Sequence, residues 1–366
     1  MSKNDPDVKY ILFHSFGATD SLFFDENARD NSTEPYIALR RQCGELGYLL
    51  EVTRDQELEK CEWLIFWNVS SIGPSRPLEG FSFGLKNRIQ GRHYRNLYKE
   101  AIRAGMSNKM AMILSEPPAV CPQNSNRALH KNFKIVFTWD NSLVDGVKYI
   151  RALLPVSAVF PKVERVPFSA RKLLTDISGN KYSGHEKELY SARRDVIQFF
   201  ERNYPHDFDL YGTGWNNPWE GGLWSRFGNA NIDRHHYCSY RGTVSNKSEI
   251  LPKYRFIICY ENSEQPDLIT NRIFDVFRCN SVPIYWGAPN IADYVDKEAL
   301  IDRHDFDSNE DLGKYISSLR ETEFEKILKA GQDYLNSDRF KPFLSNSWVD
   351  LIVDALGLGR TPKESR

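Results

Sequence analysis

Short apolar runs and longer amphipathic stretches alternate along the first half of the chain, and this pattern predicts strands and helices in turn. The two amphipathic stretches are each followed by a glycine, Gly47 and Gly105, a residue that commonly ends a helix. Strands that alternate with helices usually pair in parallel, so we expect a parallel sheet. The predicted strands are residues 8–13, 48–52, 63–67, 109–114 and 133–139, and the predicted helices are residues 35–46 and 94–104.

The same alternation resumes after residues 154–168, a stretch with three prolines and no helical period. Such a stretch is typical of a boundary between domains. We therefore expect an α/β domain over residues 1–160, a second α/β domain over residues 161–345, and a C-terminal helix and tail over residues 346–366. In the second half the predicted strands are residues 171–177, 208–211, 254–260 and 281–287, and the predicted helices are residues 186–202, residues 348–356 and one that starts near Thr270.

Polar residues within residues 253–306 follow a predicted strand at the point where it ends. Glu261 comes directly after the apolar run, and in an open α/β sheet this edge is where ligands bind. The next helix starts near Thr270, so its unpaired N–H groups and the positive end of its dipole point to the same edge. An apolar stripe on that helix leaves Asn271 and Arg272 facing the loop. This arrangement predicts an anion-binding site.

The same stretch resembles the family 10 glycosyltransferases, the α1,3-fucosyltransferases that use GDP-fucose. Their signature runs Tyr-Lys-Phe, a strand, Glu-Asn, a spacer, Thr-Glu-Lys, a helix, and Val-Pro-(Ile/Val)-Tyr-Trp-Gly-(Ala/Ser)-Pro. Asn271 departs from it, because an amide replaces the glutamate that contacts the nucleotide ribose in the family, whereas Arg272 keeps the positive charge near the phosphates. The matching residues are Tyr254-Arg255-Phe256, Glu261-Asn262, Thr270-Asn271-Arg272 and residues 282–289, and the resemblance is continuous over residues 207–306.

The resemblance implies a GT-B-like α/β fold, in which two Rossmann-type domains face each other across a cleft. It implies an inverting transfer of L-fucose from GDP-fucose to a hydroxyl of a saccharide acceptor, by a bacterial-type enzyme. The first domain would bind the acceptor and carry the catalytic base, and the second would bind the nucleotide sugar. The expected donor-binding residues in residues 253–306 are Glu261, Asn262, Thr270, Asn271 and Arg272.

Two other functions stay open. One is the same chemistry with a different nucleotide sugar, since Asn271 cannot make the charge-assisted ribose contact of a glutamate. The other is a non-catalytic module that binds a nucleotide or a sugar.

Glu116 follows the predicted strand at residues 109–114 and precedes Pro117 and Pro118. A single carboxylate after a strand is often no more than a turn or helix-cap residue. In the family, however, a glutamate before such a turn is thought to be the general base, so the resemblance implies this role for Glu116. A positioned carboxylate that removes the proton of a sugar hydroxyl typically contributes about 10²- to 10⁴-fold to the rate.

Residues 178–181 form a small polar loop between a predicted strand and a helix, an arrangement common at phosphate sites but weak evidence without a glycine fingerprint. In the family, an arginine on this helix neutralises the diphosphate and is followed by apolar residues three and seven positions later. Arg193, with Val196 and Phe200, fits this spacing, and the adjacent Arg194 is the alternative.

Two short matches to the metal-binding pattern D-x-D occur, at residues 207–209 and 305–307, and three-residue matches arise easily by chance. Arg193, Arg272 and helix N-termini can stabilise a diphosphate leaving group instead. We therefore expect no obligatory cofactor or metal; a divalent metal is possible but not required. The neighbouring His235 and His236 lack the spaced partners of a metal site.

The composition, with 41% hydrophobic and 27% charged residues among 366, is that of a globular protein. A net charge of −1 provides no strongly basic surface, which argues against a nucleic-acid partner.

The six cysteines include no C-x-x-C pair, which indicates reduced thiols. No apolar run approaches the roughly 18 residues of a membrane span, and the N-terminus lacks a signal-peptide pattern. The expected location is therefore cytoplasmic.

Five basic residues recur at spacings of 4, 3, 4 and 4. On one helix they would form a basic stripe, which is either a solvated face or a contact with an anionic membrane that carries a glycolipid acceptor. The second reading places the protein at the inner face of the membrane. The residues are Arg88, Arg92, Arg95, Lys99 and Arg103.

Overall fold

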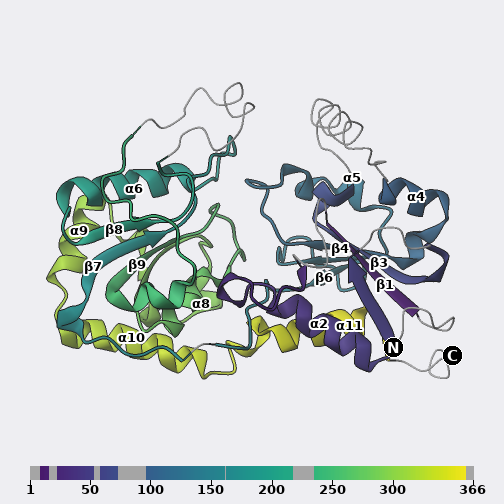
Figure 1. Ribbon diagram of the computed structural model, residues 1–366. Coiled ribbons are helices and arrows are strands. Elements are labelled where there is room, and N and C mark those ends of the chain that lie inside the picture. Colours follow the sequence, from purple (N-terminus) through teal and green to yellow (C-terminus); the bar gives the residue numbers. More distant parts are fainter. Residues whose placement is uncertain are drawn as a thin grey trace. The chain divides into compact units, whose positions relative to one another are not determined.

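The structure of the chain is a computed structural model that describes residues 9–15, 23–52, 58–72, 96–160, 162–216 and 235–359. It divides into two compact units: Met1–Val159 together with Pro342–Arg366, and Phe160–Lys341. Each unit contains one parallel sheet flanked by helices (Figure 1), which confirms the predicted α/β class. The aromatic and glycine-rich residues 217–231 lie outside the described residues.

The sheet of the first unit has six strands in the order β2-β1-β3-β4-β5-β6, and all neighbours are parallel. The chain runs from β1 outward to β2 and then continues on the other side of β1 with β3, so the strand order reverses between β1 and β3. The strands are β1 Lys9–His14, β2 Tyr48–Val52, β3 Cys61–Trp67, β4 Met110–Leu114, β5 Ile135–Thr138 and β6 Tyr149–Arg151.

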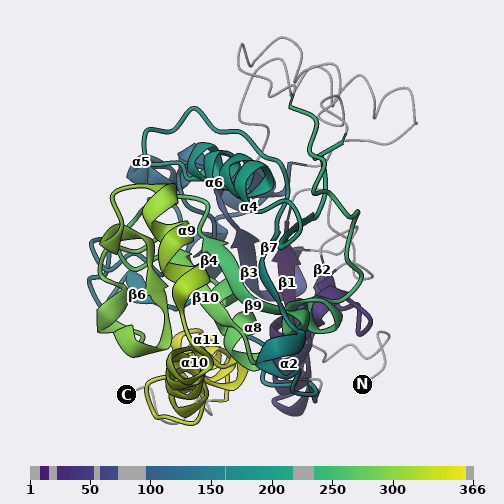
Figure 2. The same cartoon turned by 90° about the vertical axis from the view of Figure 1, so that its left-hand side faces the viewer.

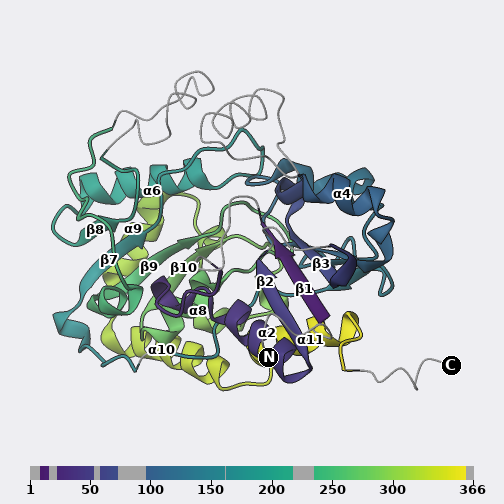
Figure 3. The same cartoon turned by 45° about the vertical axis from the view of Figure 1, so that its right-hand side comes forward.

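Side chains alternate between the two faces of this sheet along each strand, and an apolar cluster covers each face. Ile11 and Phe13 of β1 pack in one apolar cluster with helices α2 (Glu34–Glu45) and α11 (Ser345–Ala355), which lie side by side (Figures 1 and 3). Leu12 belongs to the cluster on the other face, with helix α4 (Leu97–Arg103). The C-terminal helix, which the sequence assigned to neither domain, therefore packs in the first unit. A short helix, α5 (Arg127–His130), precedes β5.

Helix α4 is shorter than the helix predicted at residues 94–104. The side chain of Asn96 accepts a hydrogen bond of 2.9 Å from the backbone N–H of Lys99, so Asn96 is the N-cap and the helix begins after it. Lys99 and Arg103 are exposed on this helix, whereas Arg88 to Arg95 precede its cap and lie outside the described residues. The cap at Asn96 therefore excludes one continuous helix over residues 88–103, which the basic stripe would require.

The sheet of the second unit has five parallel strands in the order β11-β10-β9-β7-β8, and its order reverses between β7 and β9. Helix α6 covers one face and α8 covers the other (Figure 1 and Figure 2). The strands are β7 Lys172–Ile177, β8 Phe208–Tyr211, β9 Tyr254–Tyr260, β10 Val282–Trp286 and β11 Ile301–Asp302, and the helices are α6 Tyr190–Asn203, α8 Asn271–Arg278, α9 Asn309–Ser318 and α10 Glu321–Leu335.

No helix among the described residues is both long enough and apolar enough to cross a bilayer. Five of the six cysteines are buried and Cys238 is exposed, and all six are free thiols.

The loops that follow β7 and β8 touch each other through backbone. The N–H of Ser178 donates to the carbonyl of Tyr211 at 3.0 Å, and the indole N–H of Trp215 donates to the carbonyl of Ser178 at 2.7 Å. Gly212 has a φ of 126°, and a Cβ atom there would lie 1.8 Å from the Ser178 carbonyl oxygen. Only glycine fits at this contact, which fixes the carboxyl ends of two neighbouring strands.

Gly212→Ala should therefore lower the free energy of unfolding by about 3 kcal/mol or more, because the added Cβ would clash with backbone that cannot move aside. Gly184→Ala is the matched control, since a Cβ at Gly184 meets nothing within 4 Å. Thermal and urea denaturation of both variants measure the difference. Equal stability of the two variants would contradict the contact.

Candidate functional site

Four charged side chains lie at the carboxyl edge of the second sheet, where the strand order reverses between β7 and β9. Asp176 is the penultimate residue of β7, and Glu261 follows β9 directly. Arg193 lies near the start of α6, and Arg272 lies in the first turn of α8. Asp176, Arg193 and Glu261 are at most 2% exposed. In open parallel sheets, ligands bind at this point of reversal.

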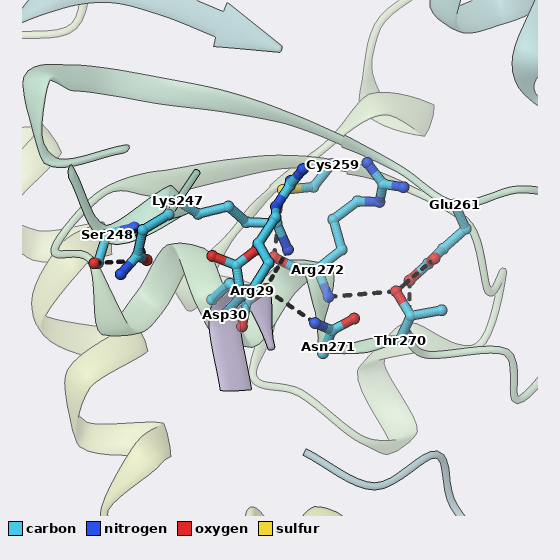
Figure 4. A network of polar contacts seen from close by, with 11 residues as sticks. Arg29, Asp30, Lys247, Ser248, Cys259, Glu261, Thr270, Asn271 and Arg272 are labelled. Carbon is cyan, nitrogen blue, oxygen red and sulfur yellow. Dashed lines mark hydrogen bonds and ion pairs between the residues drawn. The ribbon is translucent and has the colours of Figure 1, made fainter. Parts of the chain in front are cut away.

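The carboxylate of Glu261 is bonded to Thr270, the N-cap residue of α8 (Figure 4). One oxygen accepts from the backbone N–H of Thr270 at 3.0 Å, and the Thr270 hydroxyl lies 2.9 and 3.1 Å from the two oxygens. The same hydroxyl accepts from the backbone N–H of Arg272 at 3.3 Å. Glu261 therefore fixes the start of α8 and, with it, the backbone of Arg272.

Arg193 reaches from α6 to the end of β9. Its Nη2 group donates to the carbonyl of Tyr260 and, at 2.9 Å, to the carbonyl of Glu261. Burial, together with the nearby charge of Arg272, lowers the pKa of Arg193 to about 10, so the guanidinium stays charged at neutral pH. The buried Nε atoms of Arg193 and Arg272 have no hydrogen-bond partner among the described residues. Both cations can therefore still donate to a ligand.

Arg194, the sequence's alternative to Arg193, is turned to a different surface. Its guanidinium donates to the carbonyl of Lys181 at 2.7 Å and to the hydroxyl of Ser191 at 3.1 Å. Of these two neighbouring arginines, Arg193 is the one at the edge of the sheet.

The loop after β9 runs beside the segment before α6. The N–H of Leu189 donates to the carbonyl of Asn262 at 3.1 Å, and Glu188 pairs with Ser263 in an isolated bridge. These bonds tie residues 188 and 189 to the loop after β9, which explains why α6 begins at Tyr190 and not at residue 186 as predicted. They also bring Asn262 to the helix that carries Arg193.

Asn271, the residue that departs from the family signature, is bonded within its own helix. Its Nδ2 group donates to Oδ2 of Asp275 at 3.0 Å, and the same oxygen lies 2.7 Å from Nζ of Lys247 (Figure 4). In α8 the negative charge thus lies on Asp275, one turn after position 271. In the family signature it lies on the glutamate at position 271.

Asp176 was not among the residues predicted from the sequence. It is fully buried; its Oδ2 atom accepts from the Ser178 hydroxyl, and its Oδ1 atom has no partner among the described residues. Burial raises the pKa of Asp176, against the lowering effect of Arg193 and Arg272. Burial likewise raises the pKa of Glu261. Two guanidinium groups beside the N-terminus of α8 suit this site to an anion.

The only sequence signal for Asp176 is an acidic residue inside an apolar strand, one residue from its carboxyl end. The pattern predicted a strand over residues 171–177 and a candidate phosphate site only in the loop after it. Central strands that are covered on both faces are usually apolar throughout, so such an aspartate is itself informative.

Glu116 lies directly after β4 in the first unit and is partly buried. Tyr36 of α2 is its neighbour there: burial raises the pKa of the Tyr36 hydroxyl, and the negative charge of Glu116 raises it further. The carboxylate is thus held in a partly desolvated environment beside an aromatic cluster.

The D-x-D match at residues 207–209 has a different role. Asp209 is buried, and its carboxylate accepts from Lys172 at 2.7 Å, Arg241 at 2.6 Å and the Tyr254 hydroxyl at 2.6 Å. These bonds use its oxygens to join β7, β8 and β9. Within the described part of the chain, no three His, Cys, Asp or Glu side chains are grouped to hold a metal ion.

Residues 192–329 match the family model described as "Glycosyltransferase family 10 (fucosyltransferase) C-term". The alpha-(1,3)-fucosyltransferase FucT of Helicobacter pylori is 34% identical over 76 residues, which are 21% of this chain and 16% of that protein. The matched segments span only 15–16% of the length of the first curated relatives.

Among solved structures, an alpha1,3-fucosyltransferase with GDP has a TM-score of 0.52 at 13% identity, over 98% of this chain and 92% of that chain. Anabaena HepE in complex with UDP and glucose has a TM-score of 0.52 at 9% identity, over 96% and 99% of the two chains. At these identities the likeness concerns the fold alone. The chain has the two-domain GT-B fold of glycosyltransferases.

Asp176 and Asp209 should respond oppositely to pH. The raised pKa of Asp176 means that the native state binds its proton more tightly, so its contribution to stability falls as the pH rises above the ordinary value of about 3.9. Asp176→Asn should therefore gain stability relative to the unliganded wild type as the pH rises from 4 to 7, a trend measured by denaturation at each pH.

Asp209→Asn is the matched control on the neighbouring strand. Burial alone would raise the pKa of Asp209, but hydrogen bonds from Lys172, Tyr254 and Arg241 lower it overall, so its stabilisation is present at neutral pH and lost in acid. This variant should lose about 3 kcal/mol at pH 7. Curves with the same sign for both variants would contradict the assignment.

Proposed function

We propose that the chain is a family 10 glycosyltransferase that transfers L-fucose from GDP-fucose to a hydroxyl of a saccharide acceptor, because residues 192–329 match the model of that family. The observation that carries the proposal is the pair of arginines at the edge of the second sheet. Arg193 and Arg272 each keep an unpartnered Nε donor beside the N-terminus of α8. Two cations and a helix N-terminus are suited to a diphosphate.

We propose a single displacement at the anomeric carbon. The acceptor oxygen attacks this carbon while Glu116 takes the hydroxyl proton, and the bond from carbon to diphosphate breaks. The diphosphate leaves with both electrons of that bond, and Arg193 and Arg272 stabilise its added charge. One displacement inverts the configuration. Glu116 then returns its proton to solvent.

The donor contacts are proposed for the residues around Arg272. Glu261 and Thr270 hold the helix start, and the turn at Asn262 brings the loop to α6. Asn271 uses its Nδ2 group on Asp275, which leaves its amide oxygen to accept from a ribose hydroxyl. Such a bond lacks the charge assistance of a carboxylate.

The rival donor is another nucleotide sugar, and the observation that favours it is this weaker contact at Asn271. The acceptor is proposed to be a saccharide or a glycolipid. Peripheral contact with an anionic membrane is a further proposal, supported by the exposed Lys99 and Arg103 on α4.

Arg193→Met should weaken the binding of GDP by about 30-fold or more, because it removes a buried cation from the proposed diphosphate site. Arg194→Met is the matched control and should change the dissociation constant by less than about threefold, because the Arg194 guanidinium is bonded to Lys181 and Ser191, away from the edge of the sheet. Titration calorimetry with GDP measures both. A larger effect at Arg194 would show that the diphosphate lies elsewhere.

A panel of GDP-, UDP- and dTDP-sugars with saccharide acceptors tests the donor and the activity. We expect a fucosylated product from GDP-fucose, and Glu116→Gln should lower kcat by about 10²- to 10⁴-fold without changing the affinity for GDP. Product mass spectrometry and initial rates give both results. Turnover of a UDP-sugar but not of GDP-fucose would favour the rival donor; no turnover of any donor would favour a binding module.

A further inference from the structure

Asn68 stands at the point where β3 ends, beside the strand that carries Glu116. Its backbone N–H donates to the carbonyl of Ile113 at 2.8 Å, so the pairing of β3 with β4 extends to this residue. The chain then turns sharply, because Asn68 has a φ of 56°, in the left-handed region that asparagine tolerates better than most residues. The side chain is 3% exposed.

The side chain of Asn68 is bonded to the backbone N–H groups of two consecutive residues, Ser115 and Glu116. Its Oδ1 atom accepts from the N–H of Ser115 at 2.8 Å and from the N–H of Glu116 at 3.0 Å. Its Nδ2 group donates to the Ser115 hydroxyl at 2.8 Å. One side-chain amide therefore receives the backbone donors that the end of β4 would otherwise leave unpaired.

A second buried amide, that of Asn124, holds the other end of the same residue. Asn124 is 4% exposed, and its Nδ2 group donates to the carbonyl of Glu116 at 2.7 Å and to Oδ1 of Asn68 at 2.8 Å. Its own Oδ1 atom accepts from the N–H of Val69 at 2.9 Å. The N–H and the C=O of Glu116 are thus both fixed by side chains, and the two amides are bonded to each other.

Pro117 restricts the same residue further. A residue before proline is confined to extended backbone conformations, so the ψ angle of Glu116 is limited from the other side. The hydrogen bonds and the proline together fix the backbone conformation of Glu116. Rates of catalysed reactions fall steeply when a reacting group is misplaced by about 1 Å, so fixing this backbone is of direct use to a general base.

We propose that Asn68 and Asn124 form a pair of positioning residues that orient Glu116 through its backbone for proton removal from the acceptor. This inference rests on the proposed function, since it assumes that Glu116 is the base. Neither asparagine needs to touch substrate. Their effect on the rate should therefore pass entirely through Glu116.

A double-mutant cycle tests this dependence. Asn68→Gly is the informative variant, because glycine accepts the positive φ without strain while the side-chain bonds are lost. Alone, it should lower kcat by about 10- to 100-fold with the KM for GDP-fucose changed less than about twofold. Combined with Glu116→Gln, it should lower the residual rate by less than about twofold. An equal loss in both backgrounds, or no loss in the first, would overturn the proposal.

Ser71→Ala is the matched control in the same turn. The Ser71 hydroxyl is buried and donates to the backbone carbonyl of Asn68 at 2.6 Å, without touching Glu116. Ser71→Ala should change kcat by less than about twofold. If the turn affected the rate only through folding, Ser71→Ala would lower the rate as Asn68→Gly does. If Asn68→Gly does not fold, Asn124→Ala takes its place with the same expectation. Unchanged activity of Glu116→Gln would instead refute the proposed mechanism itself.

Discussion

Burial of charge at one edge of the second sheet is the constraint on which the site depends. Moving a charged side chain out of water costs several kcal/mol unless hydrogen bonds replace the lost solvent. Arg193 recovers part of this through the carbonyls of Tyr260 and Glu261, and Glu261 recovers part through Thr270. The Nε atoms of both arginines and Oδ1 of Asp176 stay unpartnered within the described residues. An anion that accepts from the two arginine Nε groups would satisfy these donors.

Close backbone approach is the second requirement, because the buried charges come from separate loops. A Cβ atom at Gly287 would lie 2.5 Å from Cγ of Glu261, so the turn after β10 can pass the carboxylate only without a side chain. Gly212 has the same role for the loops after β7 and β8. The two glycines therefore allow the loops that carry the buried charges to approach each other, although neither can contact a ligand through a side chain.

The two units hold their functional carboxylates in different ways. Glu261 is bonded through its own side chain to the cap of α8, which immobilises it, and its burial raises its pKa although the bonds from Thr270 lower it. Glu116 is held through its backbone by Asn68 and Asn124, and only part of its surface is buried. The first arrangement suits a residue that supports a helix and its arginine. The second suits a residue whose carboxylate must exchange a proton.

Local pattern predicted the longer strands, such as β4 and β9, because they are apolar runs with polar ends, but it missed β6 and β11, which have three and two residues. It failed where a long-range contact decides the outcome. The bridge between Glu188 and Ser263 delays the start of α6, and no local signal near residue 186 reports it. Asp176 and Asn68 were missed for the same reason, since a lone polar residue at a strand end gains its meaning from partners 17 to 96 residues away, such as Arg193, Arg272 and Asn124. The residues that the family resemblance supplied could be named without any long-range contact, because their spacing is contained in the chain itself.

The choice of donor must lie in few side chains, because the fold does not decide it. A structure with GDP and one with UDP and glucose have the same TM-score of 0.52 to this chain. In α8 the negative charge lies on Asp275, one turn after position 271, and Lys247 is paired with it. In the proposed donor site, a ribose hydroxyl at Asn271 would meet a neutral amide that is already bonded to Asp275. Contacts of Arg193 and Arg272 to a diphosphate would be the same for every nucleotide diphosphate sugar, so discrimination between donors would rest on the base and the sugar.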